Sequence, residues 1–244
     1  ELDEFFNSHQ EYKVVHSHLD CMSGIPLKEA RKCHIPYRIA HAHSSNQTKD
    51  IKYPLKLIFK RNITKNANYL FACGEQAGKW MFNTDNFKVL NNAIDAKAYS
   101  FNFIFRESIR KEFHIPNESF VVGHVGRFMN PKNHTFIIDI FNQFHKNHPN
   151  SYLMLVGEGE LKTSIQDKVR TLGLEDYVIF TGLRSDVNEL LQAMDVFLFP
   201  SLYEGLPVSI IEAQAAGLPC LISDKVPIEC KKTDLVYQLS LEDS

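Results

Sequence analysis

Residues 195–224 read DVFLFPSLYEGLPVSIIEAQAAGLPCLISD and contain one complete strand–helix–strand unit. Residues 195–201 form a short apolar run of the kind that is typical of a strand buried on both faces. Residues 208–216 predict a helix, and Gly217 stands where the C-terminal cap of that helix belongs. Residues 219–224 are apolar again and predict a second strand. A strand, a helix and a strand in this order indicate a parallel sheet.

The same alternation continues toward the N-terminus and is interrupted once, at about 91–103, by a stretch that we interpret as a linker. We therefore expect an α/β protein with two Rossmann-like domains that face each other across a cleft, residues 1–93 and residues 94–244. Residues 185–194 begin with Asp186 and Glu189, which resemble a capping box. The other expected strands are 12–19, 37–44, 69–74, 87–94, 119–128, 151–159 and 177–183, and the other expected helices are 23–33, 53–67, 75–82, 133–148 and 160–174.

The composition is that of an ordinary globular protein. The chain has 244 residues, of which 44% are hydrophobic and 23% charged, and its net charge is −2. A balance so close to neutral gives no electrostatic reason to expect a nucleic-acid partner. Five scattered cysteines without a CxxC pair favour reduced thiols and a cytoplasmic location. The first residues are too acidic and polar for a signal peptide, and no apolar run is long enough to span a bilayer.

Candidate functional residues follow the expected strands, because ligands of open parallel sheets bind beyond the carboxyl ends of the strands. Arg127 and Lys132 lie on one such loop, five residues apart. A planar guanidinium and a mobile ammonium on one loop suit the oxygens of a phosphate. The alternative is that both are solvated loop charges.

A second group of candidates surrounds the expected helix at 208–216. Gly205, Leu206 and Pro207 precede it, and free backbone N–H groups at a helix start favour an anion; a plain tight turn is the alternative. Glu212 lies among apolar residues and is expected to be buried, where it must find donors. Those donors are either the hydroxyls of a diol or a nearby Arg or Lys. Glu204 lies in the turn before the helix and is a candidate for binding further hydroxyls.

Several segments resemble retaining GT-B glycosyltransferases, and specifically glycosyltransferase family 4 (glycosyl transferases group 1). EGLPVSIIE, followed by AQAAGLP, resembles the E-x7-E signature of that family, and GRFMNPKN resembles its G-R-x4-K phosphate loop. The segments LVGEGE, VIFTGLRSDV and DVFLFPSLYEG follow in the order of the family, and VLNNAID is similar to its interdomain junction. The family's N-terminal Gly-rich loop and its returning C-terminal helix have no counterpart, so the resemblance implies a fold that is trimmed at both ends.

The resemblance implies a nucleotide-sugar donor, expected to be a UDP-sugar, bound mainly by residues 94–244, with residues 1–93 on the acceptor side. Arg127 and Lys132 would neutralise the diphosphate, Glu212 would bind the ribose diol, and Glu204 would contact the donor sugar. These cations make a divalent metal unnecessary, and the chain contains no Asp-x-Asp motif, so neither a metal nor a cofactor is expected. The further donor-binding residues that the resemblance implies are Gly126, Gly157, Arg184, Gly205 and Leu206.

One histidine is expected near the reacting centre. The family carries a His facing the donor sugar at the end of a strand, and His43 in AHAHSS matches this position best. His41 and His18 are the next candidates. The alternative for all three is a histidine held by local hydrogen bonds.

Residues 49–66 are basic, with Ile, Leu and Phe interleaved. Such a segment lies either on an anionic membrane surface, which would make the protein peripheral at the inner face of the membrane, or on a solvated helix face.

The expected activity is therefore that of a metal-independent, retaining hexosyltransferase acting on a glycan or lipid-linked acceptor, in the synthesis of surface or capsular polysaccharide. A GT-B-type sugar-nucleotide epimerase and a non-catalytic nucleotide-sugar-binding module are the alternatives, because a fold alone does not separate them.

Overall fold

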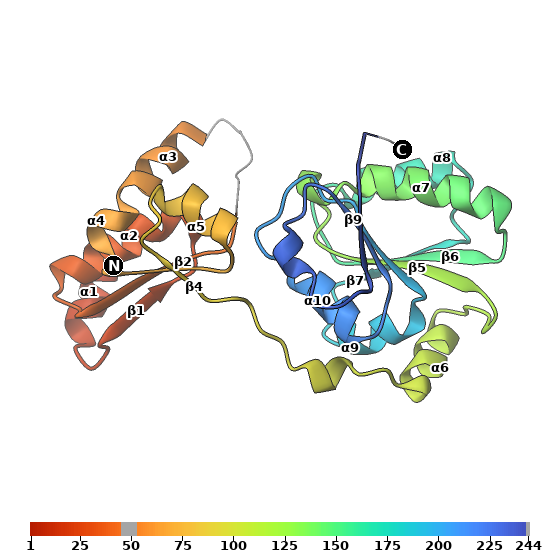
Figure 1. The fold of residues 1–244 in the computed structure, drawn as a ribbon, viewed down its shortest axis with the longest axis horizontal. Helices are drawn as coiled ribbons and strands as arrows, with labels where there is room; N and C mark the ends of the chain where they lie inside the picture. Colours follow the sequence, from red (N-terminus) through yellow and green to blue (C-terminus); the bar gives the residue numbers. More distant parts are fainter. Residues whose placement is uncertain (45–52, 243–244) are drawn as a thin grey trace. The chain divides into compact units, whose positions relative to one another are not determined.

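The structure is a computed structural model that describes residues 1–44 and 53–242. The chain divides into two compact units (Figure 1). The first comprises Glu1–Asn92 together with Glu204–Leu206, and the second comprises Ala93–Tyr203 and Pro207–Ser244. The turn Glu204–Leu206 thus belongs to a different unit from the residues that flank it in sequence.

The first unit contains a parallel sheet in the order β1-β2-β3-β4. One small core lies between α1 and α2, where Phe6, Ala30, Cys33 and Ile35 are buried. The strands are β1 (Val14–Ser17), β2 (Tyr37–Ala42), β3 (Tyr69–Ala72) and β4 (Lys88–Val89). The helices are α1 (Leu2–Ser8), α2 (Gly24–Lys32), α3 (Tyr53–Arg61), α4 (Ile63–Asn66) and α5 (Glu75–Phe82), with the 3₁₀ helix η1 at Asp20–Ser23.

The second unit contains a six-stranded parallel sheet in the order β10-β9-β8-β5-β6-β7. Its strands are β5 (Phe120–Val125), β6 (Ser151–Val156), β7 (Val178–Gly182), β8 (Val196–Phe199), β9 (Cys220–Ser223) and β10 (Val236–Leu239). Its helices are α6 (Phe103–Glu112), α7 (His134–Asn147), α8 (Lys162–Thr171), α9 (Val187–Leu190) and α10 (Val208–Ala215), with 3₁₀ helices at Ala96–Tyr99 (η2), Asn130–Lys132 (η3), Leu191–Ala193 (η4) and Ile228–Cys230 (η5).

Helices cover both faces of this sheet, with α7 and α8 on one face and α9 and α10 on the other (Figure 1). The main core fills the space between the sheet and the α7–α8 face, and its buried members include Val122, Ile137, Phe141, Leu153 and Ile165. The predicted α/β fold with parallel sheets is therefore confirmed.

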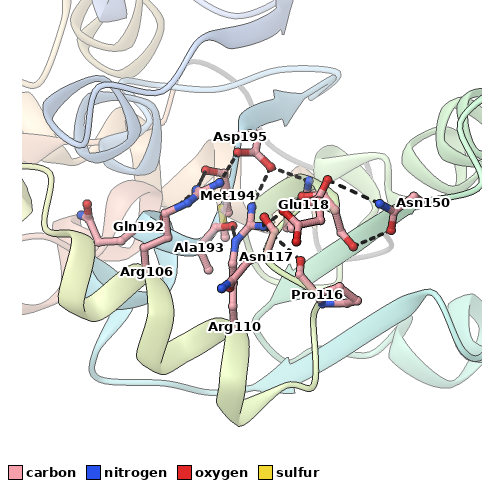
Figure 2. A network of polar contacts seen from close by, with 12 residues as sticks. Arg106, Arg110, Pro116, Asn117, Glu118, Asn150, Gln192, Ala193, Met194 and Asp195 are labelled. Carbon is pink, nitrogen blue, oxygen red and sulfur yellow. Dashed lines mark hydrogen bonds and ion pairs between the residues drawn. The ribbon is translucent and has the colours of Figure 1, made fainter.

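Apart from short 3₁₀ helices, the elements that were not expected from the sequence are α1, α6 and β10. The second of them has a physical explanation, because few apolar residues of α6 are buried. Polar contacts attach this helix instead: Arg106 and Arg110 both point toward Asp195 (Figure 2). The side chain of Asn102 caps its start by accepting hydrogen bonds from the backbone N–H groups of Ile104 and Phe105.

Two details of the expected elements differ from the structure. The strand expected at 87–94 forms only the two residues of β4. The capping box at Asp186 is wrong: Asp186 precedes α9 but its side chain makes no cap hydrogen bond, because Arg184 engages both carboxylate oxygens. Gly217 follows α10 as expected, with a φ of +80° that glycine adopts without strain.

The segment expected to be basic and amphipathic is only partly described, because residues 49–52 lie outside the described ranges. Its described part forms α3 and α4, and α3 contains no buried residue. Within residues 1–44 and 53–242, no helix combines the length and the apolar character that crossing a bilayer requires.

Candidate functional site

The sheet order of the second unit marks where a ligand is expected to bind. Chain order runs outward from β5 in opposite directions, through β6 and β7 on one side and through β8, β9 and β10 on the other. The topological switch point therefore lies between β5 and β8, and ligands of such sheets bind beyond the strand ends at this place.

The loops after β5 and β8 pack against each other at the switch point. The backbone N–H of Leu202 donates to the carbonyl oxygen of Pro131 at 2.8 Å, and Nδ2 of Asn133 donates to the carbonyl oxygen of Pro200 at 3.2 Å. Lys132, which ends the short 3₁₀ helix η3, carries its ammonium 4.7 Å from the ring centre of Phe199 on β8. The loop that carries both predicted cations is thus attached to the neighbouring strand.

A cavity of about 670 Å³ opens at the ends of β5, β6 and β7. Four of the predicted site residues line it, namely Gly126, Arg127, Gly157 and Arg184. Apolar side chains supply much of the remaining wall, while Lys132 and Glu212 are not among the residues that line it. The other lining residues are Val125, Val156, Glu158, Gly159, Glu160, Leu183 and Val187.

Gly157 is required for the close approach of two loops beside this cavity. Its φ is +141°, and a Cβ atom there would collide with the carbonyl oxygen of Gly126. Only glycine avoids both the backbone strain and the collision. The backbone after β6 therefore lies directly against the backbone after β5, at Gly126 and Arg127.

The two arginines of the cavity differ in their electrostatics. Arg184 donates to both oxygens of Asp186 at 2.8 and 2.6 Å and to Glu112 at 2.6 Å, and these hydrogen bonds raise the pKa of Arg184. The guanidinium of Arg127 is exposed and makes no hydrogen bond or ion pair within residues 1–44 and 53–242. Of the two, only Arg127 presents an uncompensated positive charge to the cavity.

Glu212, on α10, is half-buried rather than buried, and its partner is neither of those expected. The hydroxyl of Tyr99 donates to its Oε1 at 2.8 Å, and burial together with this carboxylate raises the pKa of Tyr99 to about 12. Oε2 accepts no hydrogen bond from the described part of the protein. The donor to Glu212 is the neutral hydroxyl of Tyr99, and no lysine or arginine of residues 1–44 and 53–242 forms an ion pair with this carboxylate.

The predicted turn before α10 lies in the first unit. Glu204 and Gly205 are half-buried and Leu206 is buried. The helix itself begins at Val208, with Pro207 at the N-cap. The start of the helix therefore agrees with the expected range 208–216.

The histidine candidates of the first unit lie close together. Nδ1 of His18 and Nε2 of His43 are 2.7 Å apart, and the rings of His41 and His43 are stacked with centres 4.3 Å apart. Burial, followed by the nearby His18, lowers the pKa of His43. His16, which was not expected, joins them, with Nε2 3.3 Å from Nδ1 of His41. Its only signal in the sequence was the repeated His-x-His pattern.

Two further histidines of the second unit, His124 and His134, were also not expected. Both are buried, with exposed fractions of 0% and 2%, and their rings are 4.8 Å apart. Nδ1 of His124 donates to the carbonyl oxygen of Leu198 at 2.9 Å. Burial lowers the pKa of His134 to about 4 and that of His124 well below its ordinary value, and the positive charge of Lys132 lowers both further.

Because the pKa values of His124 and His134 are lowered in the folded protein, we expect the free energy of unfolding to fall in mild acid. Below an unfolded pKa of about 6.5 the unfolded chain binds protons that the folded chain excludes, so stability falls as the pH falls. Lowering the pH from 7 to 5 is expected to cost about 2 kcal/mol for His134, and His124 acts in the same direction. Urea unfolding of wild type and of His134→Phe at both pH values tests this, because phenylalanine preserves the stacking on Phe128. Identical pH dependence in the two proteins would contradict the prediction.

Comparisons with known proteins agree on one family. The sequence profile of "Glycosyl transferases group 1" matches residues 105–231. The chain is 34% identical to the putative glycosyltransferase EpsF of Bacillus subtilis over 95% of its length, and 28% identical to the UDP-Gal:alpha-D-GlcNAc-diphosphoundecaprenol alpha-1,3-galactosyltransferase of Escherichia coli over 88%. It spans 63% and 58% of these relatives. The crystal structure of Anabaena Alr3699/HepE in complex with UDP superposes with a TM-score of 0.80 at 20% identity, covering 98% of this chain and 68% of that chain.

Proposed function

The chain belongs to the glycosyl transferases group 1 family, and on that premise we propose that it transfers a sugar from a UDP-sugar to a glycan or lipid-linked acceptor. The observation that carries the proposal is the uncompensated guanidinium of Arg127, which lines the cavity at the ends of β5, β6 and β7 and lies on the same loop as Lys132. A diphosphate is the part of the donor that such a loop would neutralise.

The diphosphate is proposed to bind between the loop 126–132 and the start of α10, with Arg127 and Lys132 as its cations. As the glycosidic bond breaks, negative charge grows on the leaving nucleoside diphosphate, and fixed positive charge there lowers the barrier. Lys132 and Arg127 act in this step without a divalent cation. The cavity next to them, with its apolar wall and glycine backbone, would receive the nucleoside end.

Arg184 is proposed to bind the donor at its nucleoside end. Its charge is already shared between Glu112 and Asp186, so it would form a wall of the nucleoside cavity and not bind phosphate. Gly126 and Gly157 let the backbone approach the ligand closely. Gly205 and Leu206 would contribute backbone amides, and Glu204 and His43 would contact the donor sugar.

Glu212 is proposed to bind the ribose hydroxyls, because its Oε2 is available and its Oε1 is held by the Tyr99 hydroxyl. Glu212→Ala in the full-length protein is expected to raise the Kd for UDP about tenfold and to lower the transfer rate at least about tenfold, since a charged hydrogen bond from the ribose diol to the carboxylate is lost. Isothermal titration with UDP measures the first effect. Glu175→Ala, an exposed carboxylate of the same unit, is the control, and an unchanged Kd in Glu212→Ala would remove Glu212 from the site.

The donor and the acceptor are inferred from the relatives. The Anabaena structure contains UDP, the Escherichia coli relative is named for a UDP-sugar donor and a diphosphoundecaprenol acceptor, and another relative is a Vi polysaccharide biosynthesis protein. These names support a UDP-hexose, a lipid-linked or glycan acceptor and a role in surface polysaccharide. Transfer with retention, as in glycosyltransferase family 4, is part of the same proposal.

The proposed reaction takes place in the cytoplasm, which agrees with the buried free thiols of Cys21, Cys33, Cys73 and Cys220. Peripheral contact of residues 49–66 with an anionic membrane stays a prediction. Cosedimentation with anionic but not with neutral vesicles would support it, and cosedimentation with neither would remove it.

A panel of nucleotide sugars tests the function. Selective binding of UDP-sugars should raise the melting temperature of the full-length protein, whereas ADP- and GDP-sugars should not. Release of UDP only after an acceptor is added would identify a transferase. Sugar epimerisation without acceptor, or binding without any product, would contradict the proposal.

A further inference from the structure

Four histidines of the first unit gather on one face of its sheet. β1 and β2 pair in parallel, with His16 opposite Ile39 and Ser17 opposite Ala40. Side chains alternate between the two faces of a strand, so the pattern His-x-His places both histidines of each pair on the same face. His16 and His18 therefore meet His41 and His43 across two neighbouring strands.

Ring nitrogens of three of these histidines lie close enough together that they could hold one metal ion. Each of His16, His18 and His41 offers a ring nitrogen within 4.8 Å of those of the other two. Nε2 of His16 and Nδ1 of His41 are 3.3 Å apart. Two nitrogens that bind one tetrahedral zinc ion at about 2.0 Å are separated by about 3.3 Å, so this pair already has the separation that coordination needs.

The fourth histidine is placed to orient the cluster. Nε2 of His43 lies 2.7 Å from Nδ1 of His18, which leaves Nε2 of His18 as the coordinating atom. Asp20 holds the neighbouring segment, because Oδ1 accepts from the backbone N–H of His43 and Oδ2 accepts from the hydroxyl of Ser44. Metal-binding histidines commonly have such a partner on their second nitrogen, which fixes the tautomer and the ring orientation.

The chemistry of the cluster selects among metals. All three candidate ligands are histidines, and an imidazole ring binds a metal ion through the lone pair of a ring nitrogen. Neutral imidazole suits Zn²⁺, Ni²⁺ and Cu²⁺, whereas Mg²⁺ and Ca²⁺ prefer oxygen ligands.

We propose that His16, His18 and His41 bind one transition-metal ion that favours imidazole ligands, namely Zn²⁺, Ni²⁺ or Cu²⁺, and that His43 orients His18. The site lies within the first unit and is not required by the sugar transfer proposed above, which uses no metal. Its occupancy would fix the four rings relative to one another.

Metal titration of the full-length, metal-free protein without a polyhistidine tag tests the proposal. Isothermal titration with ZnCl₂ is expected to show one ion per chain, and MgCl₂ is expected to show none. His16→Ala and His18→Gln change exposed residues and should each weaken Zn²⁺ binding at least about tenfold. His148→Ala, an exposed histidine of the second unit, is the matched control and should bind as wild type does.

Substitution with Co²⁺ identifies the ligands independently. Visible absorption of tetrahedral cobalt without the near-ultraviolet band of a cobalt–thiolate bond is expected, because all ligands are imidazoles. A thiolate band, zinc binding that is unchanged in both histidine variants, or no zinc binding would each overturn the proposal. None of these outcomes alters the test of sugar transfer, since that test uses nucleotide sugars alone.

Discussion

Lys132→Ala is expected to lower kcat/KM for sugar transfer by about 100-fold while the protein remains folded. The ammonium is proposed to stabilise the negative charge that develops on the leaving diphosphate, and removal of one such group typically costs about 10²–10³ in rate. The folded state should persist because Lys132 is half-buried and lies on a loop outside the hydrophobic core of the second unit.

Steady-state kinetics with the full-length protein measure this effect, and circular dichroism verifies the fold. Lys168→Ala removes the same charge from an exposed pair with Asp139 and should change kcat/KM less than about twofold. Arg127→Ala should resemble Lys132→Ala, since both cations would act on one diphosphate. A wild-type rate in Lys132→Ala would place the diphosphate elsewhere.

Asp195→Ala is expected to reduce the free energy of unfolding by about 3–5 kcal/mol, because it leaves a buried arginine without its counter-charge. Arg110 is 1% exposed and donates to Oδ2 of Asp195 at 2.8 Å, while Arg106 donates to Oδ1 at 2.6 Å (Figure 2). The same carboxylate accepts from the backbone N–H of Val121 at the start of β5. Loss of the Asp195 carboxylate therefore weakens the attachment of α6. It also removes a hydrogen bond that holds the start of β5.

Urea unfolding at pH 7 measures this free energy. Asp167→Ala provides the control, because its pair with Arg170 is exposed on both sides and is expected to contribute less than about 1 kcal/mol. An effect of Asp195→Ala as small as that of Asp167→Ala would show that the network of Figure 2 does not hold α6.

Much of the fold was predictable from local pattern. The alternation of apolar runs and amphipathic segments predicted the strands from β1 to β9 and the helices α7, α8 and α10. The failure at α6 has a physical cause. Helix α6 is attached by arginines, which carry no apolar periodicity, and the partner of those arginines, Asp195, is more than 80 residues away in the sequence.

The candidate site was predictable in part, because strand ends and glycines mark where backbone meets a ligand. Gly126, Arg127, Gly157 and Arg184 do line one cavity. Which of the charged groups have an ion-pair partner was not predictable from the sequence. Sequence predicted Arg127 as a cation for the diphosphate and Arg184 as a further donor-binding residue, and the pairing of Arg184 with Asp186 and with Glu112 of the unexpected α6 came only from the structure.

By itself, the sequence determined the fold class, the family and the loops that carry the candidate residues, since each depends on residues close together along the chain. Tertiary structure alone decided which charges are compensated, that Tyr99 is the partner of Glu212 across 113 positions, and that His16 meets His41 across 25. The reason is physical: hydrogen bonds and ion pairs act over a few ångströms, and strand order determines which distant segments come within that range.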